Sequence, residues 1–183
     1  MPEPAKPLSV RAAVETDVPA ITRIYRSAVV NGTASFELEP PDEAEMLRRY
    51  RAVIEAGFPY LVCEERSGAV RGYAYLGQYR PRPAYRFTVE NSIYVAPEAH
   101  RSGIGRKLLE ALIARAADMG YRQMIAVIGD SGQRASIGLH RALGFTFCGT
   151  VHSVGWKHGR WLDQVLMQRP LGDGDSTPPP SGR

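Results

Sequence analysis

The sequence lacks the features that mark secreted, membrane-spanning or metal-binding chains. It contains two cysteines, Cys63 and Cys148, in apolar strand-like stretches without a CxxC pair, which predicts buried, unreactive thiols rather than a disulfide. The four histidines show no H-E-x-x-H spacing, so we expect no metal. No apolar run approaches the ~20 residues that span a bilayer, and residues 1–14 include no long apolar segment. We therefore expect a cytoplasmic protein without a signal peptide or a membrane partner.

The charge is not strongly of one sign either. The chain of 183 residues is 44% hydrophobic and 23% charged, with a net charge of +4. This length and composition fit one domain with a substantial core. A charge this modest suits an anionic small ligand as well as it suits nucleic acid, so charge alone does not identify the partner.

Apolar periodicity predicts alternating strands and helices. Strands are expected at residues 8–14, 60–65, 69–79, 86–95, 122–129, 146–158 and 160–170, and helices at 15–29, 42–57, after Gly105 and at 135–143. A single mixed, mostly antiparallel sheet flanked by helices buries these patterns most simply, which is an α/β fold over residues 1–170. Residues 171–183 have no apolar periodicity, so a disordered tail is predicted there.

The turn before the third predicted helix is the most informative feature. It carries Gly103 and Gly105 among basic residues such as Arg101 and Arg106, but a dinucleotide fingerprint would need a glycine where Leu108 stands, and Walker A does not fit. A helix N-terminus offers unpaired N–H groups and partial positive charge, and glycines let a phosphate approach closely. These properties favour a pyrophosphate ligand, with an ordinary turn carrying solvated basic residues as the alternative.

Two titratable residues are candidates for proton transfer. Alternation along residues 86–95 places Glu90 on the same face as Thr88 and Ser92, in mid-strand, where glutamate is disfavoured. A carboxylate there could take the proton from an attacking amine, or it could be an ordinary surface residue. His140 lies four residues after Ser136, the expected N-cap of a short helix, so both project from one side. A structural or exposed histidine is the alternative.

Two basic segments are candidates for recognition. Arg80 and Arg82 lie in a proline-stiffened connector before Glu90, and guanidinium groups suit bidentate capture of a carboxylate or phosphinate. A solvated basic loop is the alternative. Residues 156–161, Trp-Lys-His-Gly-Arg-Trp, could stack on nucleic acid, but a hairpin turn between the last two strands is the preferred interpretation.

The stretch His-Arg-Ser-Gly-Ile-Gly at residues 100–105 resembles the acyl-CoA pyrophosphate motif [QR]-x-x-G-x-[GA] of the GNAT superfamily of N-acetyltransferases, with His100 in place of the usual Gln or Arg. The stretches TVENSIYV, AVIG, LHRALGF and WKHGRWLD are similar to the subgroup of phosphinothricin, methionine sulfoximine and methionine sulfone acetyltransferases. The resemblance covers residues 8–170, and its second half is the more specific.

The resemblance implies an enzyme that acetylates the α-amino group of a small L-amino acid analogue by direct attack of the amine on the thioester of acetyl-CoA. It implies Glu90 as the general base and His140 as the group that assists departure of the thiolate. It also implies a cytoplasmic homodimer with no metal, linked to herbicide resistance. The cofactor-binding residues implied are Ile93, Tyr94, Val95, His100, Arg101, Ser102, Gly103, Ile104, Gly105, Arg106, Gln133 and Ser136. The substrate-binding residues implied are Phe36, Arg80, Arg82, Tyr85 and Thr88.

Alternatives of three kinds stay open. The acceptor could be another amine: a protein N-terminus, a lysine or a polyamine, although the basic segment around Arg80 disfavours a polyamine. A non-catalytic acyl-CoA-binding regulatory module would keep the glycine turn and need neither Glu90 nor His140. A nucleic-acid binder ranks third, and we expect no nucleic-acid partner. Such a binder would be recognised by steeply salt-dependent binding that is indifferent to acetyl-CoA.

Overall fold

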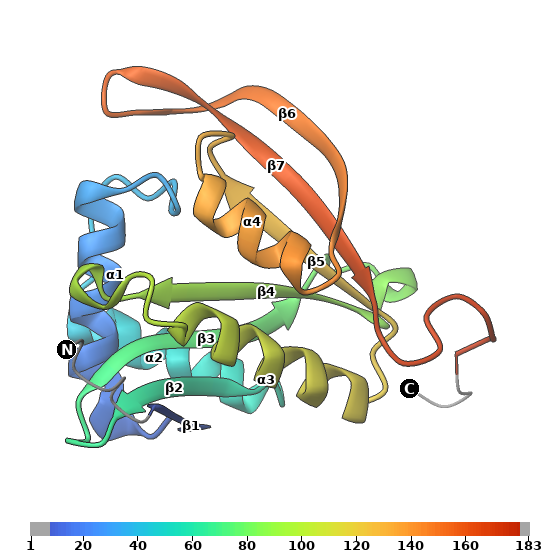
Figure 1. Cartoon of the computed structure of the whole chain (residues 1–183), viewed down its shortest axis with the longest axis horizontal. Helices are drawn as coiled ribbons and strands as arrows, with labels where there is room; N and C mark the ends of the chain where they lie inside the picture. Colours follow the sequence, from blue (N-terminus) through green and yellow to red (C-terminus); the bar gives the residue numbers. More distant parts are fainter. Residues whose placement is uncertain (1–7, 180–183) are drawn as a thin grey trace, which may run out of the picture.

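The structure, a computed structural model, describes residues 8–179 (Figure 1). The strands are β1 (Leu8–Ala12), β2 (Tyr60–Glu65), β3 (Val70–Gln78), β4 (Thr88–Val95), β5 (Gln123–Gly129), β6 (Thr146–Lys157) and β7 (Arg160–Pro170). The α-helices are α1 (Val18–Asn31), α2 (Glu43–Glu55), α3 (Ile104–Asp118) and α4 (Arg134–Ala142). Short 3-10 turns occupy η1 (Glu15–Asp17), η2 (Pro83–Tyr85) and η3 (Pro97–Ala99). None of the helices in this described part is long and apolar enough to cross a membrane.

The seven strands form one sheet in the order β1-β2-β3-β4-β5-β7-β6. Every neighbouring pair is antiparallel except β4 and β5, which run parallel. The predicted mixed, mostly antiparallel sheet is therefore confirmed. The strands β6 and β7 form a long hairpin that rises above the rest of the sheet (Figure 1).

The two faces of the sheet are covered by different helices. On β3, Gly72 points to α3, where an added Cβ would meet Ile104 Cγ2 at 2.6 Å. The next residue, Tyr73, points the other way and stacks on Tyr94 of β4, which meets Tyr25 of α1 edge-on. Because side chains alternate along a strand, α1 lies on one face and α3 on the other. The described core lies between these helices and the sheet, with Leu108, Leu109, Leu112, Val89 and Met124 fully buried.

The parallel pair separates before either strand ends. The strands β4 and β5 are in register only from Thr88 with Gln123 to Asn91 with Ala126. Beyond this point β4 continues beside β3 to Val95, and β5 continues beside β7 to Gly129. The sheet therefore opens into a fork between β4 and β5, and α3 and α4 begin just after its two arms.

Several local expectations differ from the structure. Asp17 precedes α1, but its carboxylate accepts from Val14 N at 2.9 Å and pairs with Arg11, so it does not cap that helix through its side chain. Ser136 lies inside α4 rather than at its N-cap, which is Gln133. Cys63 is buried as predicted, whereas Cys148 is exposed on the edge strand β6, most of whose residues are exposed.

The segment predicted as a disordered tail has described contacts over its first part. Leu171 is 2% exposed, and its N–H donates to Arg122 O at 2.9 Å. The Arg122 guanidinium in turn donates to Gly174 O and to Thr177 Oγ1. These contacts come from a residue about fifty positions earlier in the chain, which local periodicity does not register. The rest of the predicted tail lies outside the described residues, and the domain boundary at residue 170 stays a prediction.

Candidate active site

A cleft of about 590 Å³ passes through the fork. Residues of α1 such as Ser27 and Asn31 line it on one face of the sheet, and Leu139 and His140 of α4 line it on the other. Between these two sides, the cleft is lined by the ends of β4 and β5, which no longer pair with each other, and by the segment that leads into α3. A ligand in this cleft can therefore reach groups on both faces of the sheet at once.

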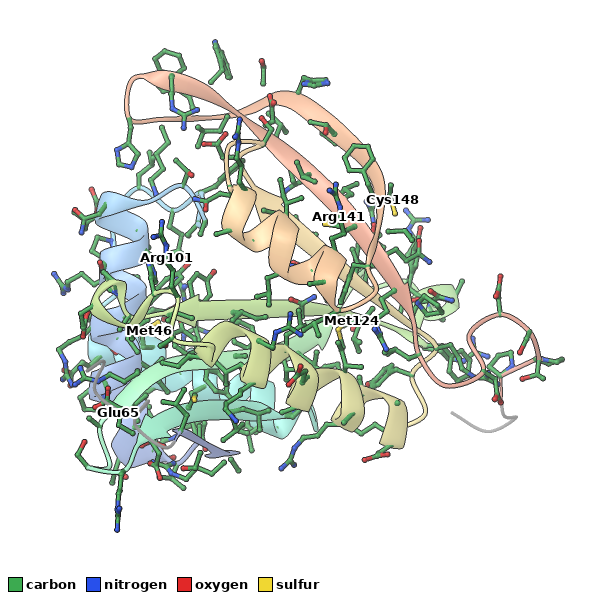
Figure 2. The ribbon with its side chains drawn as sticks, in the orientation of Figure 1. Met46, Glu65, Arg101, Met124, Arg141 and Cys148 are labelled. Carbon is green, nitrogen blue, oxygen red and sulfur yellow. The ribbon has the colours of Figure 1, made fainter. Side chains whose placement is uncertain are left out.

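The mouth of the cleft is formed by the N-terminus of α3. Gly103 is the N-cap of this helix with φ 88°, a left-handed conformation that glycine adopts without steric cost. Before it, Ser102 Oγ donates to Ala99 O at 2.6 Å, and His100 Nε2 lies 3.2 Å from Val95 O. Figure 2 shows Arg101 on the loop that enters the helix. The turn thus presents free helical N–H groups and a guanidinium to an anion at the mouth.

The predicted cofactor residues are brought together at this cleft. All of them line it except Ser102, whose hydroxyl is turned back into the loop. The motif position His100, where Gln or Arg is usual, is exposed and contacts the carbonyl of Val95. Gln133 lies at the other wall, where its Nε2 donates to Thr33 Oγ1 at 2.9 Å.

Glu90 lies beside the cleft, on the face that α1 and α2 cover. It pairs across the strands with Gly77 and is half-buried. Burial raises its pKa above the ordinary 4.5 and is the one cause of the shift among the described residues. Its charge also contributes to the raised pKa of Tyr75, after burial, so the two side chains lie near each other. Glu90 does not itself line the cleft, but Ser92, two residues along on the same face, does.

His140 lies on the opposite face and is 4% exposed. Its Nε2 is 3.0 Å from Asn91 Oδ1, and its Nδ1 is 2.8 Å from Ser136 O. The Asn91 amide is oriented by its Nδ2, which donates to Ile125 O at 3.2 Å. Asn91 is the last residue of β4 in register with β5, so one amide joins the vertex of the fork to the candidate acid.

This arrangement sets two effects on the His140 ring against each other. Both ring nitrogens face oxygen acceptors, and a neutral imidazole has only one N–H to donate. The two acceptors therefore favour the doubly protonated ring. Burial lowers the pKa of His140, and the Ser136 carbonyl opposes that shift. Protonation of a group in the cleft requires the ring to exchange one of these contacts for that group.

The predicted substrate residues are less closely grouped. Thr88 is half-buried on the same face of β4 as Glu90. Arg80 and Arg82 are exposed on the connector between β3 and β4, and the Arg80 guanidinium lies 6.0 Å from the centroid of the Tyr85 ring. Phe36 lies elsewhere, on the loop after α1. None of these residues lines the cleft among the described residues.

Sequence reasoning missed three residues that the structure places at or around the site. Asn91 contacts His140, Tyr75 lies near Glu90, and Lys157 contacts the loop after α1. Asn91 carried a signal, because it is a polar residue on the apolar face of its strand. Lys157 carried none, because alternation with Trp156 would turn the tryptophan inward and the lysine outward. Tyr75 carried none, because an aromatic residue in a strand is typical of any core.

The described residues fit an acyl-CoA better than they fit a metal. Within residues 8–179 no group of three or more His, Cys, Asp or Glu side chains could hold a metal ion, and the metal-free expectation stays a prediction. The helix N-terminus at the mouth suits a pyrophosphate, and the open edges of β4 and β5 offer backbone groups to an amide-containing arm. Residues 93–95 and Arg101 to Arg106 would hold these two parts.

Comparison with known proteins identifies the class. The chain matches the acetyltransferase (GNAT) domain family over residues 10–166. It is 56% identical over 171 residues to a phosphinothricin N-acetyltransferase of Alcaligenes faecalis, covering 93% of this chain and 86% of that protein. It is 44% identical over 170 residues to an L-methionine sulfoximine/L-methionine sulfone acetyltransferase of Pseudomonas paraeruginosa, covering 93% and 98%.

A solved structure agrees with this assignment. The crystal structure of a phosphinothricin acetyltransferase from Sinorhizobium meliloti in complex with AcCoA superposes with a TM-score of 0.93 at 51% identity, covering 96% of this chain and 94% of that one. The chain therefore belongs to the GNAT acetyltransferase family. It is an acetyl-CoA-dependent N-acetyltransferase, and the predicted family, fold class, enzyme class and co-substrate are confirmed.

Proposed function

We propose that this enzyme acetylates the α-amino group of a small L-amino acid analogue such as phosphinothricin, methionine sulfoximine or methionine sulfone. The relatives named for these acceptors match nearly the whole chain. The candidate residues offer a carboxylate for the amino group of such an acceptor and guanidinium groups for its anionic groups. The observation that carries the proposal is the cleft through the fork, with a half-buried carboxylate on one face and a buried imidazole on the other. Acetylation of a herbicidal compound of this kind would protect the cell that makes the enzyme, so the proposal includes herbicide resistance.

The base is Glu90 in this proposal. An amino group is mostly protonated near neutral pH and must lose a proton before it attacks the thioester that acetyl-CoA supplies. Burial raises the pKa of Glu90, which makes the carboxylate a stronger base. At a pH above this raised pKa the carboxylate is ionised and can accept the proton. The acceptor reaches it from the face of α1 and α2, past Ser92 at the edge of the cleft.

His140 assists the departing thiolate from the other face. Its ring lines the cleft and is held at both nitrogens, so its position is fixed while its proton is shared with Asn91 or Ser136. A thiolate with a solution pKa of about 8.5 needs little help to leave, so this contribution is modest. The remaining candidates act in recognition: Arg80 and Arg82 for the anionic groups of the acceptor, and Phe36, Tyr85 and Thr88 as walls.

A cytoplasmic homodimer completes the proposal. Both described cysteines are free thiols, which suits a reducing compartment. The strand β6 is an edge strand, and its hairpin with β7 exposes Phe147, Val151, Val154, Trp156 and Trp161. An exposed apolar strip on a long edge is typical of an interface. Light scattering of the wild type and Val151→Lys checks this: a dimer that becomes a monomer supports it, and a monomeric wild type contradicts it.

The function is tested by release of free thiol from acetyl-CoA with L-phosphinothricin, L-methionine sulfoximine and L-methionine sulfone. We expect turnover of at least one of them, and a fall of ~10²-fold or more in kcat for Glu90→Gln. The matched control is Glu55→Gln, which makes the same chemical change at the exposed end of α2. Absence of turnover on all three acceptors, with acetyl-CoA still bound, would overturn the proposed acceptor class.

A further inference from the structure

At the tip of the β6–β7 hairpin the apolar side chains are exposed and a charged side chain is buried. Trp156 is 57% exposed and Trp161 is 60% exposed, whereas Lys157 between them in the hairpin is 4% exposed. Lysine is almost never buried unless it is paired, because taking an ammonium group out of water is costly. Lys107, the other described lysine, stands exposed on α3. The inward orientation of Lys157 therefore calls for a specific partner.

That partner is the loop that follows α1. The Lys157 Nζ donates to the main-chain oxygen of Ser35 at 2.8 Å, its one hydrogen bond to a described residue. Ser35 is itself buried, and its hydroxyl lies 2.9 Å from Tyr25 OH and accepts from Glu37 N at 3.2 Å. Burial lowers the pKa of Lys157, and the negative charge of Glu37 on the same loop opposes this shift. The ammonium group is thus placed where the loop supplies both a dipole and a nearby carboxylate.

The contact with Ser35 fixes the ring of the next residue. Phe36 lies over two glycines, one at the end of β5 and one in β6. A Cβ added at Gly129 would stand 2.9 Å from Phe36 Cε1, and one added at Gly155 would stand 2.5 Å from Phe36 Cε2. Any other residue at either position would push the ring away. Two residues of the β6–β7 hairpin, Gly155 and Lys157, and Gly129 of the adjacent strand β5 therefore set the position of Phe36.

The loop is a wall of the cleft and is held from other sides as well. Its residues Gly32 and Ala34 line the cleft directly. His158, next to Lys157, has its Nε2 3.1 Å from Gly32 O, and Gln133 of α4 donates to Thr33 Oγ1. These partners come from a hundred or more residues later in the sequence. The loop has no regular structure of its own, so its position depends on them.

We propose that Lys157 is a positioning residue for the acceptor: its ammonium group fixes the Ser35–Phe36 wall and so determines how well the amino acid binds. The inference rests on the proposed function, because it takes Phe36 as an acceptor wall. It differs from a role in acetyl-CoA binding, because within the described part of the chain the cofactor residues of β4 and of the turn into α3 make no hydrogen bond with Ser35, Phe36 or Lys157. Of the predicted cofactor residues, only Gln133 of α4 is hydrogen-bonded to the loop, at Thr33. It therefore predicts a change in the KM of one substrate and not of the other.

The test compares Lys157→Met, which keeps the length of the side chain without its charge, with Lys157→Arg, which keeps charge and donors. We expect Lys157→Met to raise the KM of the amino acid about tenfold, with kcat and the KM of acetyl-CoA within about twofold of wild type. Lys157→Arg should recover much of that loss. The matched control is Arg66→Met, which removes one positive charge from the exposed turn between β2 and β3. Equal effects on both KM values, or none, would overturn the proposal.

A second measurement makes the result independent of the acceptor. Hydrogen exchange of the amides at residues 33–37 should quicken in Lys157→Met while exchange in α3 is unchanged. Gly155→Ala, which displaces Phe36 from the other side, should also raise the KM of the amino acid if Lys157→Met fails to fold. If wild type acetylates none of the three amino acids, the proposed function fails. The exchange data alone then test whether Lys157 holds the loop in place. Unchanged exchange in that case overturns this inference too.

Discussion

The two walls of the cleft are built in different ways. The proposed cofactor wall is a continuous run from the end of β4 to the first turn of α3, in which each residue is placed by its neighbours in sequence. The proposed acceptor wall is the loop at residues 32–37, which is held by α1, by the start of α4 and by the tip of the β6–β7 hairpin. Arg101, which lines the cleft, lies on the loop that leads into α3 (Figure 2).

This difference separates a wall that would bind through backbone groups from a wall that depends on side-chain contacts. A helix N-terminus binds an anion through backbone groups that any sequence supplies, so we expect the proposed cofactor wall to tolerate His100 in its motif. The acceptor wall depends on side chains from distant segments, each of which can move it slightly. Substitutions in the first wall should therefore affect acetyl-CoA, and substitutions around the second should affect the amino acid.

The largest effect on this comparison is expected from Gly103→Ala. A left-handed conformation costs a residue with a Cβ about 1–2 kcal/mol, which the loop would relieve by leaving the conformation that presents its N–H groups. We expect the Kd of acetyl-CoA, measured by calorimetry, to rise about five- to thirtyfold. The matched control is Gly68→Ala, which has φ 81° in the turn between β2 and β3. Equal Kd values for the two variants would contradict the role of Gly103.

Asn91→Leu tests the vertex of the fork between the two walls. It removes the acceptor of His140 Nε2 and leaves Ile125 O without its donor. We expect kcat to fall about tenfold and the free energy of unfolding to fall by about 1–3 kcal/mol, measured by thiol release and by urea titration. Asn91→Asp keeps an acceptor for His140 and should retain more activity. A kcat for Asn91→Leu equal to wild type at every pH would rule out a positioning role.

Glu90→Gln should increase stability while it removes activity. The unfolded carboxyl ionises near 4.5, whereas burial raises the pKa in the folded state, so the unfolded state binds fewer protons between these two values. Stability is therefore lost, and base activity gained, as pH rises through this window. We expect Glu90→Gln to melt at a higher temperature than wild type at pH 7 and at the same temperature below both pKa values. A lower melting temperature at pH 7 would contradict a desolvated carboxylate.

The smallest effect is expected outside both walls. Arg122→Met removes the hydrogen bonds to Gly174 O, Thr177 Oγ1 and Pro178 O, while Leu171 keeps its buried side chain. Such partly exposed contacts contribute about 1 kcal/mol or less to the free energy of unfolding. We expect faster proteolysis after residue 171 and unchanged thiol release. Protection equal to wild type would show that these contacts do not order the segment.

The parts of the site that were predictable are those that depend on near neighbours. Alternation placed Glu90 with Thr88 and Ser92 on one face, and the structure has them so. The spacing of Ser136 and His140 put them on one side of a helix, although Ser136 is not the cap. Their catalytic and binding roles stay predictions. The separation of the cleft from Arg80 and Arg82 could not be predicted, because the direction of an irregular connector depends on what it packs against.

The sequence by itself determined the domain class, the order of the elements and the glycine turn, because hydrophobic periodicity and glycine conformation act over a few residues. It also carried a resemblance specific enough to indicate the enzyme family. Only the tertiary structure decided that β4 and β5 part at Asn91, that both nitrogens of His140 are occupied, and that Lys157 holds Ser35. Each of these features includes a contact between segments far apart in the sequence: Asn91 with Ala126, Asn91 with His140, and Lys157 with Ser35. Which buried polar group finds which partner is fixed there by packing.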